Sequence, residues 1–172
     1  TLQFTGGEPI INKEHYELLE SIPTEIKRRI NLRYASNLSY IKFKQYDLIK
    51  IWNEFKSVNI KVSMDGVGDV YNYIRRDGDW DNVYNNMKVL NNEPTINLAV
   101  GITVQSHNIF HMPEFYKFWK ESPVFLQFIT ANILQTPKYL RPNLWPDEYR
   151  ELIIKKLEEA EQEFPAMKKF IT

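Results

Sequence analysis

The hydrophobic residues of this chain follow two alternating patterns. Short runs rich in β-branched and aromatic residues predict five strands, at residues 2–5, 30–35, 59–64, 96–104 and 125–133. Between these runs, apolar residues recur at helical spacing. They predict helices at 13–22, from Asp47 through Phe55, from Asp79 or Asp81 to Leu90, at 113–120, and at 146–163 with Tyr149, Leu152, Ile153, Leu157 and Ala160 facing inward.

A strand begins about every 30 residues, which is the length of a βαβ unit. Successive units of this kind require parallel strands joined by right-handed crossovers. We therefore expect an α/β fold, a partial (β/α) TIM-like barrel of about five parallel units. An open doubly wound sheet is the alternative that the pattern leaves open. We expect one domain, with β/α units over 1–143 and a C-terminal helix over 144–172.

Composition narrows the class of protein. The chain has 172 residues, of which 43% are hydrophobic, enough for a substantial core. Its 22 basic residues balance 22 acidic ones, so the charge gives no reason to expect a nucleic acid or membrane partner. No apolar run approaches the roughly 20 residues that a membrane helix needs. We expect a cytoplasmic protein.

The chain contains no cysteine. Disulfides, thiolate metal sites, iron–sulfur ligation by this chain and a cysteine nucleophile are therefore excluded. His107 and His111 have a spacing compatible with a metal ion, but no third ligand is evident. We predict no metal site and assign no catalytic residue.

Polar residues follow three successive predicted strands. Gly6, Gly7 and Glu8 follow the first, Ser36 and Asn37 end the second, and Ser63 and Asp65 end the third. In parallel α/β folds the loops after the strands converge on the ligand site. Glycines beside two of these groups allow close approach of the backbone to a ligand. The pattern predicts a shared small-molecule site at this edge.

These segments resemble motifs of the radical S-adenosylmethionine (SAM) superfamily. Residues 4–9 (FTGGEP) are similar to its Gly-Gly-Glu-Pro loop, and Ser36-Asn37 to its Thr-Asn-Gly, with Leu38 in place of the glycine. Residues 62–66 (VSMDG) match its Val-Ser-Leu-Asp-Gly. Residues 71–75 resemble its His-Asp-x-x-Arg, and 80–90 its "phe-x-x-val-x-x-asn-ile-x-x-leu" helix. Order and spacing agree over residues 2–108. The similarity is greatest to members with a twitch or SPASM-type auxiliary domain, such as molybdenum-cofactor-biosynthesis-like and peptide-modifying enzymes.

The resemblance implies a partial barrel that holds SAM and a [4Fe–4S] cluster, in which SAM is cleaved reductively to a deoxyadenosyl radical. Carried over by motif, the glycine loop would hold the SAM amino group. Ser63 and Arg75 would face the carboxylate or ribose, and Asp65 would brace its loop. The cofactor-binding residues implied in this way are Gly6, Gly7, Glu8, Pro9, Asn37, Ser63, Asp65 and Arg75. An ammonium group prefers carboxylate and carbonyl acceptors, and a carboxylate prefers a guanidinium.

One departure from the family is large. The family's cluster loop, Cys-x-x-x-Cys-x-x-Cys, precedes the Gly-Gly-Glu strand, and this chain has neither that loop nor auxiliary cysteines. The resemblance thus implies the middle of a radical SAM protein, without its first β/α unit and its tail. The cluster would belong to the full-length parent only, and this chain alone would be inactive.

Two other functions remain open at this point. A degenerate α/β domain could act as a structural module that self-associates through an exposed first strand, because unpaired sheet edges recruit partners. An unrelated α/β enzyme could bind a phosphorylated ligand at the same edge, but no Lys or Arg stands near Gly6 to support it. The substrate is not defined by any motif.

Overall fold

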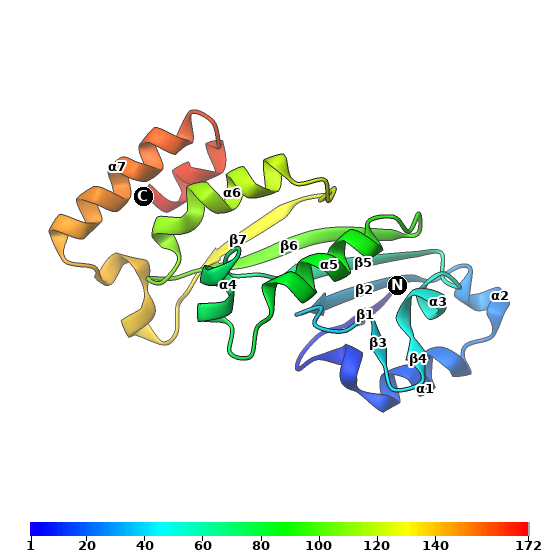
Figure 1. Ribbon diagram of the computed structural model, residues 1–172. Coiled ribbons are helices and arrows are strands. Elements are labelled where there is room, and N and C mark those ends of the chain that lie inside the picture. The colour runs from blue at the N-terminus through cyan, green and yellow to red at the C-terminus, as the bar shows by residue number, and fades with distance from the viewer. Residues whose placement is uncertain (172) are drawn as a thin grey trace. The chain divides into compact units, whose positions relative to one another are not determined.

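The computed structural model describes residues 1–171, and its main feature is a five-stranded sheet in the order β1-β2-β5-β6-β7. The strands are β1 (Leu2–Phe4), β2 (Asn31–Ser36), β5 (Ser57–Ser63), β6 (Ile96–Val104) and β7 (Ile129–Ile133). The sheet is parallel. Figure 1 shows β1, β2 and β5 side by side in this order. All five predicted strands are present, and the predicted α/β fold is confirmed.

Helices follow the strands at the predicted places. They are α1 (Lys13–Ser21), α2 (Thr24–Lys27), α3 (Leu48–Trp52), α4 (Asp69–Ile74), α5 (Trp80–Leu90), α6 (Met112–Glu121), α7 (Asp147–Glu161) and α8 (Lys168–Ile171). Asn12, Asp47 and Asp79 cap α1, α3 and α5 by accepting backbone N–H bonds, as these residue types commonly do. Short 3₁₀ turns complete the chain: η1 (Pro9–Ile11), η2 (Ile109–His111), η3 (Lys138–Leu140), η4 (Pro142–Leu144) and η5 (Pro165–Met167). No helix within residues 1–171 is both long and apolar enough to cross a bilayer.

A small hairpin and three short helices lie outside the predicted elements. The hairpin pairs β3 (Lys42–Phe43) with β4 (Tyr46–Asp47) in antiparallel register. Its strands are two residues long, too short for a period-two pattern to stand out. The helices are α2, α4 and α8, of four to six residues each, and α4 follows the Asp65-Gly66 turn.

The two central strands β2 and β5 bury one face and leave the other polar. Leu32 and Tyr34 are buried while Arg33 between them is exposed, and Ile60 and Val62 are buried while Lys61 is exposed. A parallel sheet with helices on both faces has near-continuous apolar strands instead. The alternation shows that this part of the sheet has one apolar face and one polar face.

The chain packs as two compact units. The first unit comprises residues 1–64, 79–101 and 123–130, and the second comprises 65–78, 102–122 and the residues from 131 on. The expected single domain, divided at residue 143, stays a prediction. In the first unit, α1 and α3 cover the buried face of β2, since the ring of Tyr34 lies 5.5 Å from that of His15 and 5.3 Å from that of Trp52.

In the second unit, α6 and α7 lie side by side (Figure 1). Phe115 of α6 and Ile153 and Leu157 of α7 are buried, and Lys156 forms an ion pair with Glu114 across the two helices. The prediction that Tyr149 and Leu152 face inward is wrong, because they are 43% and 56% exposed. The buried stripe of α7 is narrower than predicted, with Ile153 and Leu157 one helical turn apart.

Candidate functional site

The glycine loop after β1 leaves its backbone open. Gly6 and Gly7 have φ angles of +82° and +54°, a conformation that glycine adopts without the steric cost of a side chain. A Cβ atom built on either residue would meet no heavy atom within 4 Å. The need for glycine is thus conformational, and the space beside the backbone is free for a ligand.

The carboxylate of Glu8 links the ends of two neighbouring strands. Its Oε1 accepts hydrogen bonds from the Ser36 hydroxyl at 2.7 Å and from the Ile10 N–H at 3.4 Å. Its Oε2 accepts from the Asn37 N–H at 2.7 Å. A carboxylate has about four acceptor positions, so three are used and about one remains for a ligand. Pro9 is buried behind Glu8 at the start of η1.

The loop after β2 keeps a glycine-like backbone without a glycine. Leu38 has a φ of +55°, in the left-handed region, and its side chain is fully buried. The Leu38 N–H donates to the Ser36 hydroxyl oxygen at 2.8 Å. The side chain of Asn37 accepts from the Ser39 N–H at 2.9 Å, which fixes the turn. Asn37 therefore contributes its backbone N–H to Glu8, while its side chain shapes the loop.

Two asparagines of α5 hold this loop in place. Asn86 donates to the Leu38 carbonyl at 3.0 Å, and Asn82 donates to the Ser39 carbonyl at 2.8 Å. Asn86 is 8% exposed and is the asparagine of the "phe-x-x-val-x-x-asn-ile" helix. We had assigned it no role from the sequence. A polar residue at a core position of a predicted helix is the signal that could have identified it, since buried amides need partners.

Ser63 ends β5 with an unused hydroxyl group. It is half-buried, and its Cα pairs with that of Gly101 in the parallel register. Its hydroxyl makes no hydrogen bond with the residues described here. It is a free donor and acceptor at the end of a central strand.

In the second unit, the carboxylate of Asp65 is held by two protein groups. Its Oδ1 accepts from the Thr103 N–H at 2.8 Å, and its Oδ2 lies 2.9 Å from Nη2 of Arg75. The Arg75 side chain is 25% exposed, yet its Nε is buried without a partner in the described part of the chain. These contacts fix the loop that carries Asp65, and its role beside SAM stays a prediction.

Asn108 completes this network. Its amide nitrogen donates to the carbonyls of Asp65 at 2.8 Å and Thr103 at 2.9 Å, and its Oδ1 accepts from the Gln105 N–H at 2.8 Å. Asn108 is fully buried. The structure gives it a structural role, because all its polar atoms are used within the protein.

An aromatic cluster lies behind the glycine loop. Phe4 stacks on Tyr34, and Nε2 of His15 lies 2.8 Å from the Tyr34 hydroxyl. Burial lowers the pKa of His15 to about 4, and burial raises the pKa of Tyr34. Both groups are therefore neutral at pH 7. They anchor β1 and take no part in proton transfer at that pH.

The candidate residues fall into two groups. Gly6, Gly7, Glu8, Pro9, Asn37 and Ser63 belong to the first unit, and Asp65 and Arg75 to the second. Hydrogen bonds join Glu8 to Asn37, and an ion pair joins Asp65 to Arg75. Within residues 1–171, no three His, Asp or Glu side chains gather in a way that could hold a metal ion.

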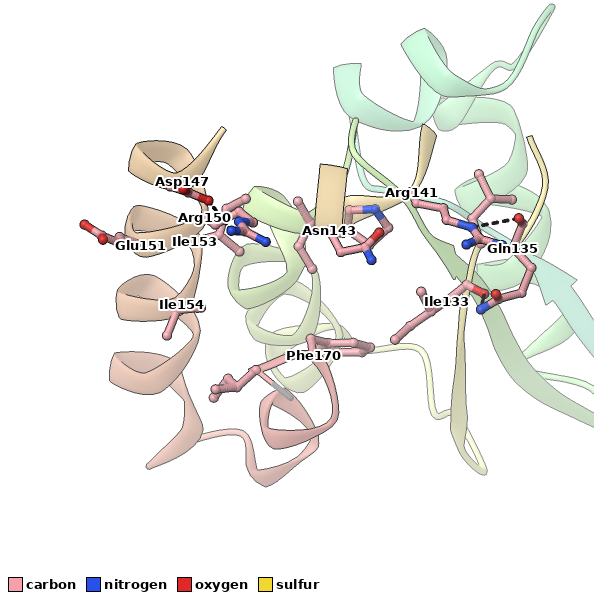
Figure 2. Close-up of a pocket in the computed structure, with 14 residues that line it drawn as sticks. Ile133, Gln135, Arg141, Asn143, Asp147, Arg150, Glu151, Ile153, Ile154 and Phe170 are labelled. Carbon is pink, nitrogen blue, oxygen red and sulfur yellow. Dashed lines mark hydrogen bonds and ion pairs between the residues drawn. The ribbon is translucent and has the colours of Figure 1, made fainter. Parts of the chain in front are cut away.

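One cavity in the described part of the chain lies away from these residues. It measures about 660 Å³, belongs to the second unit, and is lined by apolar residues such as Ile133, Ile153 and Phe170. Figure 2 shows Arg150 beside Asp147, and Arg141 bonded to Gln135, so both guanidinium groups are engaged within the chain. None of the predicted ligand-binding residues lines it. The chemistry of this cavity does not match the predicted site.

Comparison with known proteins establishes the fold. No family model and no curated protein matches the chain. Several solved structures match the chain. Native anSMEcpe with bound AdoMet and Kp18Cys peptide has a TM-score of 0.67 and 20% identity, covering 96% of this chain and 47% of that one. Native anSMEcpe with bound AdoMet has a TM-score of 0.65 and 21% identity, with coverages of 92% and 44%, and SuiB of Streptococcus suis bound to S-adenosylmethionine has a TM-score of 0.62 and 17% identity, with coverages of 94% and 36%.

These matches confirm the fold that the motif resemblance predicts. The chain has the fold of these AdoMet-bound proteins. It spans less than half the length of the solved chains that it matches, 47% at most among those described here.

Proposed function

We propose that this chain binds S-adenosylmethionine at the carboxyl ends of its strands, as part of the catalytic core of a radical SAM enzyme. The observation that carries the proposal is the open glycine backbone next to Glu8, whose carboxylate keeps about one free acceptor position. The comparison supports the proposal, because solved structures of similar fold hold AdoMet.

The residues present fit the polar groups of SAM. The amino group is an ammonium donor, for which a carboxylate and backbone carbonyls are suitable acceptors. The carboxylate and ribose of SAM need donors, which the Ser63 hydroxyl and the guanidinium of Arg75 supply. Asp65 and Asn37 would contribute by fixing the loops that carry these groups.

The residues present do not fit an iron–sulfur cluster, because the chain has no cysteine to ligate one. Reductive cleavage of SAM is the chemistry that a [4Fe–4S] cluster held elsewhere in a full-length parent would supply. We propose no reaction for this chain by itself. A cytoplasmic location and a relationship to molybdenum-cofactor-biosynthesis-like enzymes are likewise proposals.

Calorimetric titration of SAM and of methylthioadenosine, which lacks the amino and carboxylate groups, tests the proposal. Glu8→Gln should weaken SAM binding about tenfold, the usual worth of one charge-assisted hydrogen bond, and leave methylthioadenosine binding unchanged. Ser36→Ala is the matched control, because it removes a Glu8 partner while keeping the carboxylate. Equal losses in both variants would mean that Glu8 only joins β1 to β2.

A second pair of variants tests the donors. Arg75→Gln should weaken SAM binding, whereas Arg76→Gln should not, because Arg76 is 96% exposed and has only a 3.8 Å contact with Asp77. SAM binding that is absent in the unaltered chain, or that is insensitive to Glu8, Ser63 and Arg75 variants alike, would contradict the proposed site.

A self-associating structural module is the second candidate function. It is favoured by β1, which has three residues and stands at the end of the strand order of the described sheet. Sedimentation equilibrium should then show a concentration-dependent dimer. A strict monomer at high protein concentration would exclude association through this strand.

A further inference from the structure

The polar face of the sheet in the first unit carries a second cavity, of about 430 Å³. Its lining includes side chains from β1, β2, β5 and β6, among them Gln3, Arg33, Asn59, Lys61 and Asn97. These residues stand on the face opposite the apolar core, at alternate positions of their strands. The sequence motifs did not point to this face.

The charged residues that line this cavity are both cationic. They are Arg33 and Lys61, and the lining includes no carboxylate. Neither residue forms an ion pair within residues 1–171, so no acidic side chain of their unit compensates either charge. Two uncompensated cations facing one cavity create a local positive potential that attracts anions.

The register of the sheet places these two cations near each other. Arg33 pairs with Asn59, and Ala35 pairs with Lys61, so Arg33 and Lys61 are diagonal neighbours on adjacent strands. From the spacing of strands and the rise per residue, their Cα atoms are roughly 8 Å apart. Both side chains are long enough to reach a single oxyanion lying between them.

The side chain of Lys61 crosses the neighbouring strand β6 next to a glycine, Gly101. A Cβ atom on Gly101 would lie 3.3 Å from Cδ and 3.4 Å from Cγ of Lys61. The aliphatic stem therefore packs over the backbone of β6, where a side chain at position 101 would press against it. This packing restricts the ammonium group before any ligand binds, which lowers the entropy lost on binding.

Amide side chains surround the two charges. Gln3, Asn59, Asn97 and Gln127 line the cavity. The amide groups of these side chains make no hydrogen bonds with residues 1–171, so their donors and acceptors are free for a ligand. The cavity thus combines two fixed charges with neutral hydrogen-bonding groups that can select the polar atoms around an anion.

We infer that this face binds a ligand carrying an oxyanion, a carboxylate or a phosphate, with its charge between Arg33 and Lys61. The binding of an anion here does not depend on the proposed function. Only the identification of that anion as the substrate of the enzyme rests on it. Carboxylate and phosphate share the chemistry that a guanidinium and an ammonium recognise. The experiment below distinguishes them.

Nuclear magnetic resonance titrations test the inference. Sodium phosphate and sodium glutarate are added separately at constant ionic strength, and the side-chain signals of Arg33, Lys61 and the lining amides are followed. We expect saturable shifts with at least one anion. Arg33→Gln and Lys61→Gln should each weaken this binding about tenfold. Saturation by phosphate alone or glutarate alone identifies the group.

Matched controls remove the same charge elsewhere in the first unit. Arg29→Gln and Lys56→Gln affect exposed residues that do not line the cavity, and they should leave the affinity unchanged. Gly101→Ala should weaken binding by displacing the Lys61 stem. Shifts that do not saturate, or control variants that lose as much affinity as the Arg33 and Lys61 variants, would overturn the inference. Arg33 and Lys61 would then be ordinary solvated cations.

SAM titration of the same samples separates the two proposals. If anion binding is absent while SAM still binds, only the inference fails. If SAM does not bind while anion binding persists with the expected variants, only the proposed function fails. Both Gln variants alter exposed side chains, and their unfolding transitions verify that the fold is kept.

Discussion

Two carboxylates at strand ends, Glu8 in the first unit and Asp65 in the second, are held in different ways. Glu8 accepts bonds from Ser36 and Asn37, and it adjoins a glycine backbone with open space around it. Asp65 is 8% exposed, is paired with Arg75, and lies in a loop held by Asn108. Both residues carry a carboxylate, and both follow a strand. The openness of the surroundings distinguishes the carboxylate that we propose to bind a ligand from the one held within its loop.

This difference predicts different sensitivities. Loss of Asn108, which holds the loop of Asp65, should affect mainly stability, because Asn108 is fully buried and the groups that it bonds lose their partner away from water. Changes around Glu8 should affect mainly ligand affinity, since its loop keeps room and acceptor capacity. The variants below probe the buried supports on both sides of this comparison.

The largest effect is expected for Asn108→Ala. The change leaves the carbonyls of Asp65 and Thr103 and the N–H of Gln105 without their partner in a buried setting. Each orphaned group costs about 1–3 kcal/mol, and partial relaxation brings the total to about 4 kcal/mol. Chemical denaturation measures this loss.

Asn92→Ala is the control for this prediction. Asn92 is exposed and makes one bond, to the Lys88 carbonyl at 3.1 Å. It should change the free energy of unfolding by less than about 0.5 kcal/mol. If Asn108→Ala cost no more than Asn92→Ala, the loop of Asp65 would not depend on this network.

A smaller loss is expected for Leu38→Gly, on the side of Glu8. Removing the fully buried leucine side chain costs about 3 kcal/mol. Relief of the left-handed backbone, with φ at +55°, returns about 1 kcal/mol. The net destabilisation should therefore be about 2 kcal/mol, measured by denaturation.

Lys44→Gly has the same backbone but the opposite burial. Lys44 is exposed and has a φ of +52° in the turn of the hairpin. Relief of the backbone strain there outweighs the exposed contact of Lys44 with the Phe43 ring, 5.2 Å away, so the variant should be stabilised by up to about 1 kcal/mol. The same sign of effect in both variants would refute the claim that burial of Leu38 outweighs its strain.

These residues also show what could be predicted from the sequence. The strand rhythm and the strand-end motifs predicted the five strands and the placement of Glu8, Ser63 and Asp65, because both are local patterns. The bonds of Glu8 to Asn37 and of Asn86 to Leu38 join residues 29 and 48 positions apart. Such partners depend on tertiary register, which one sequence does not define.

The polar sheet face was missed for another reason. Arg33, Asn59 and Lys61 alternate with buried residues, a period-two signal that was present in the sequence. We used that signal only to locate strands. In a parallel sheet it also indicates that one face is not covered by apolar helices, and therefore where a ligand can lie.

The smallest effect concerns pH and the strand that leads to Glu8. Burial lowers the pKa of His15 to about 4, from an ordinary value near 6.5, so the unfolded chain binds this proton more readily. Stability is therefore full above pH 6.5 and falls as the pH drops from 6.5 toward 4. Between pH 7.5 and 5.5 the loss should be about 1 kcal/mol.

Denaturation at the two pH values should show this loss in the unaltered chain and most of it removed in His15→Gln. His107→Gln, which changes an exposed histidine, should retain it. Burial also lowers the pKa of His111, so a smaller residual slope should remain in His15→Gln. An unchanged slope in His15→Gln would mean that the imidazole is not held neutral behind β1. The strand that leads to Glu8 would then depend on other contacts, because the hydrogen bond of His15 with Tyr34 joins α1 to the sheet at this point.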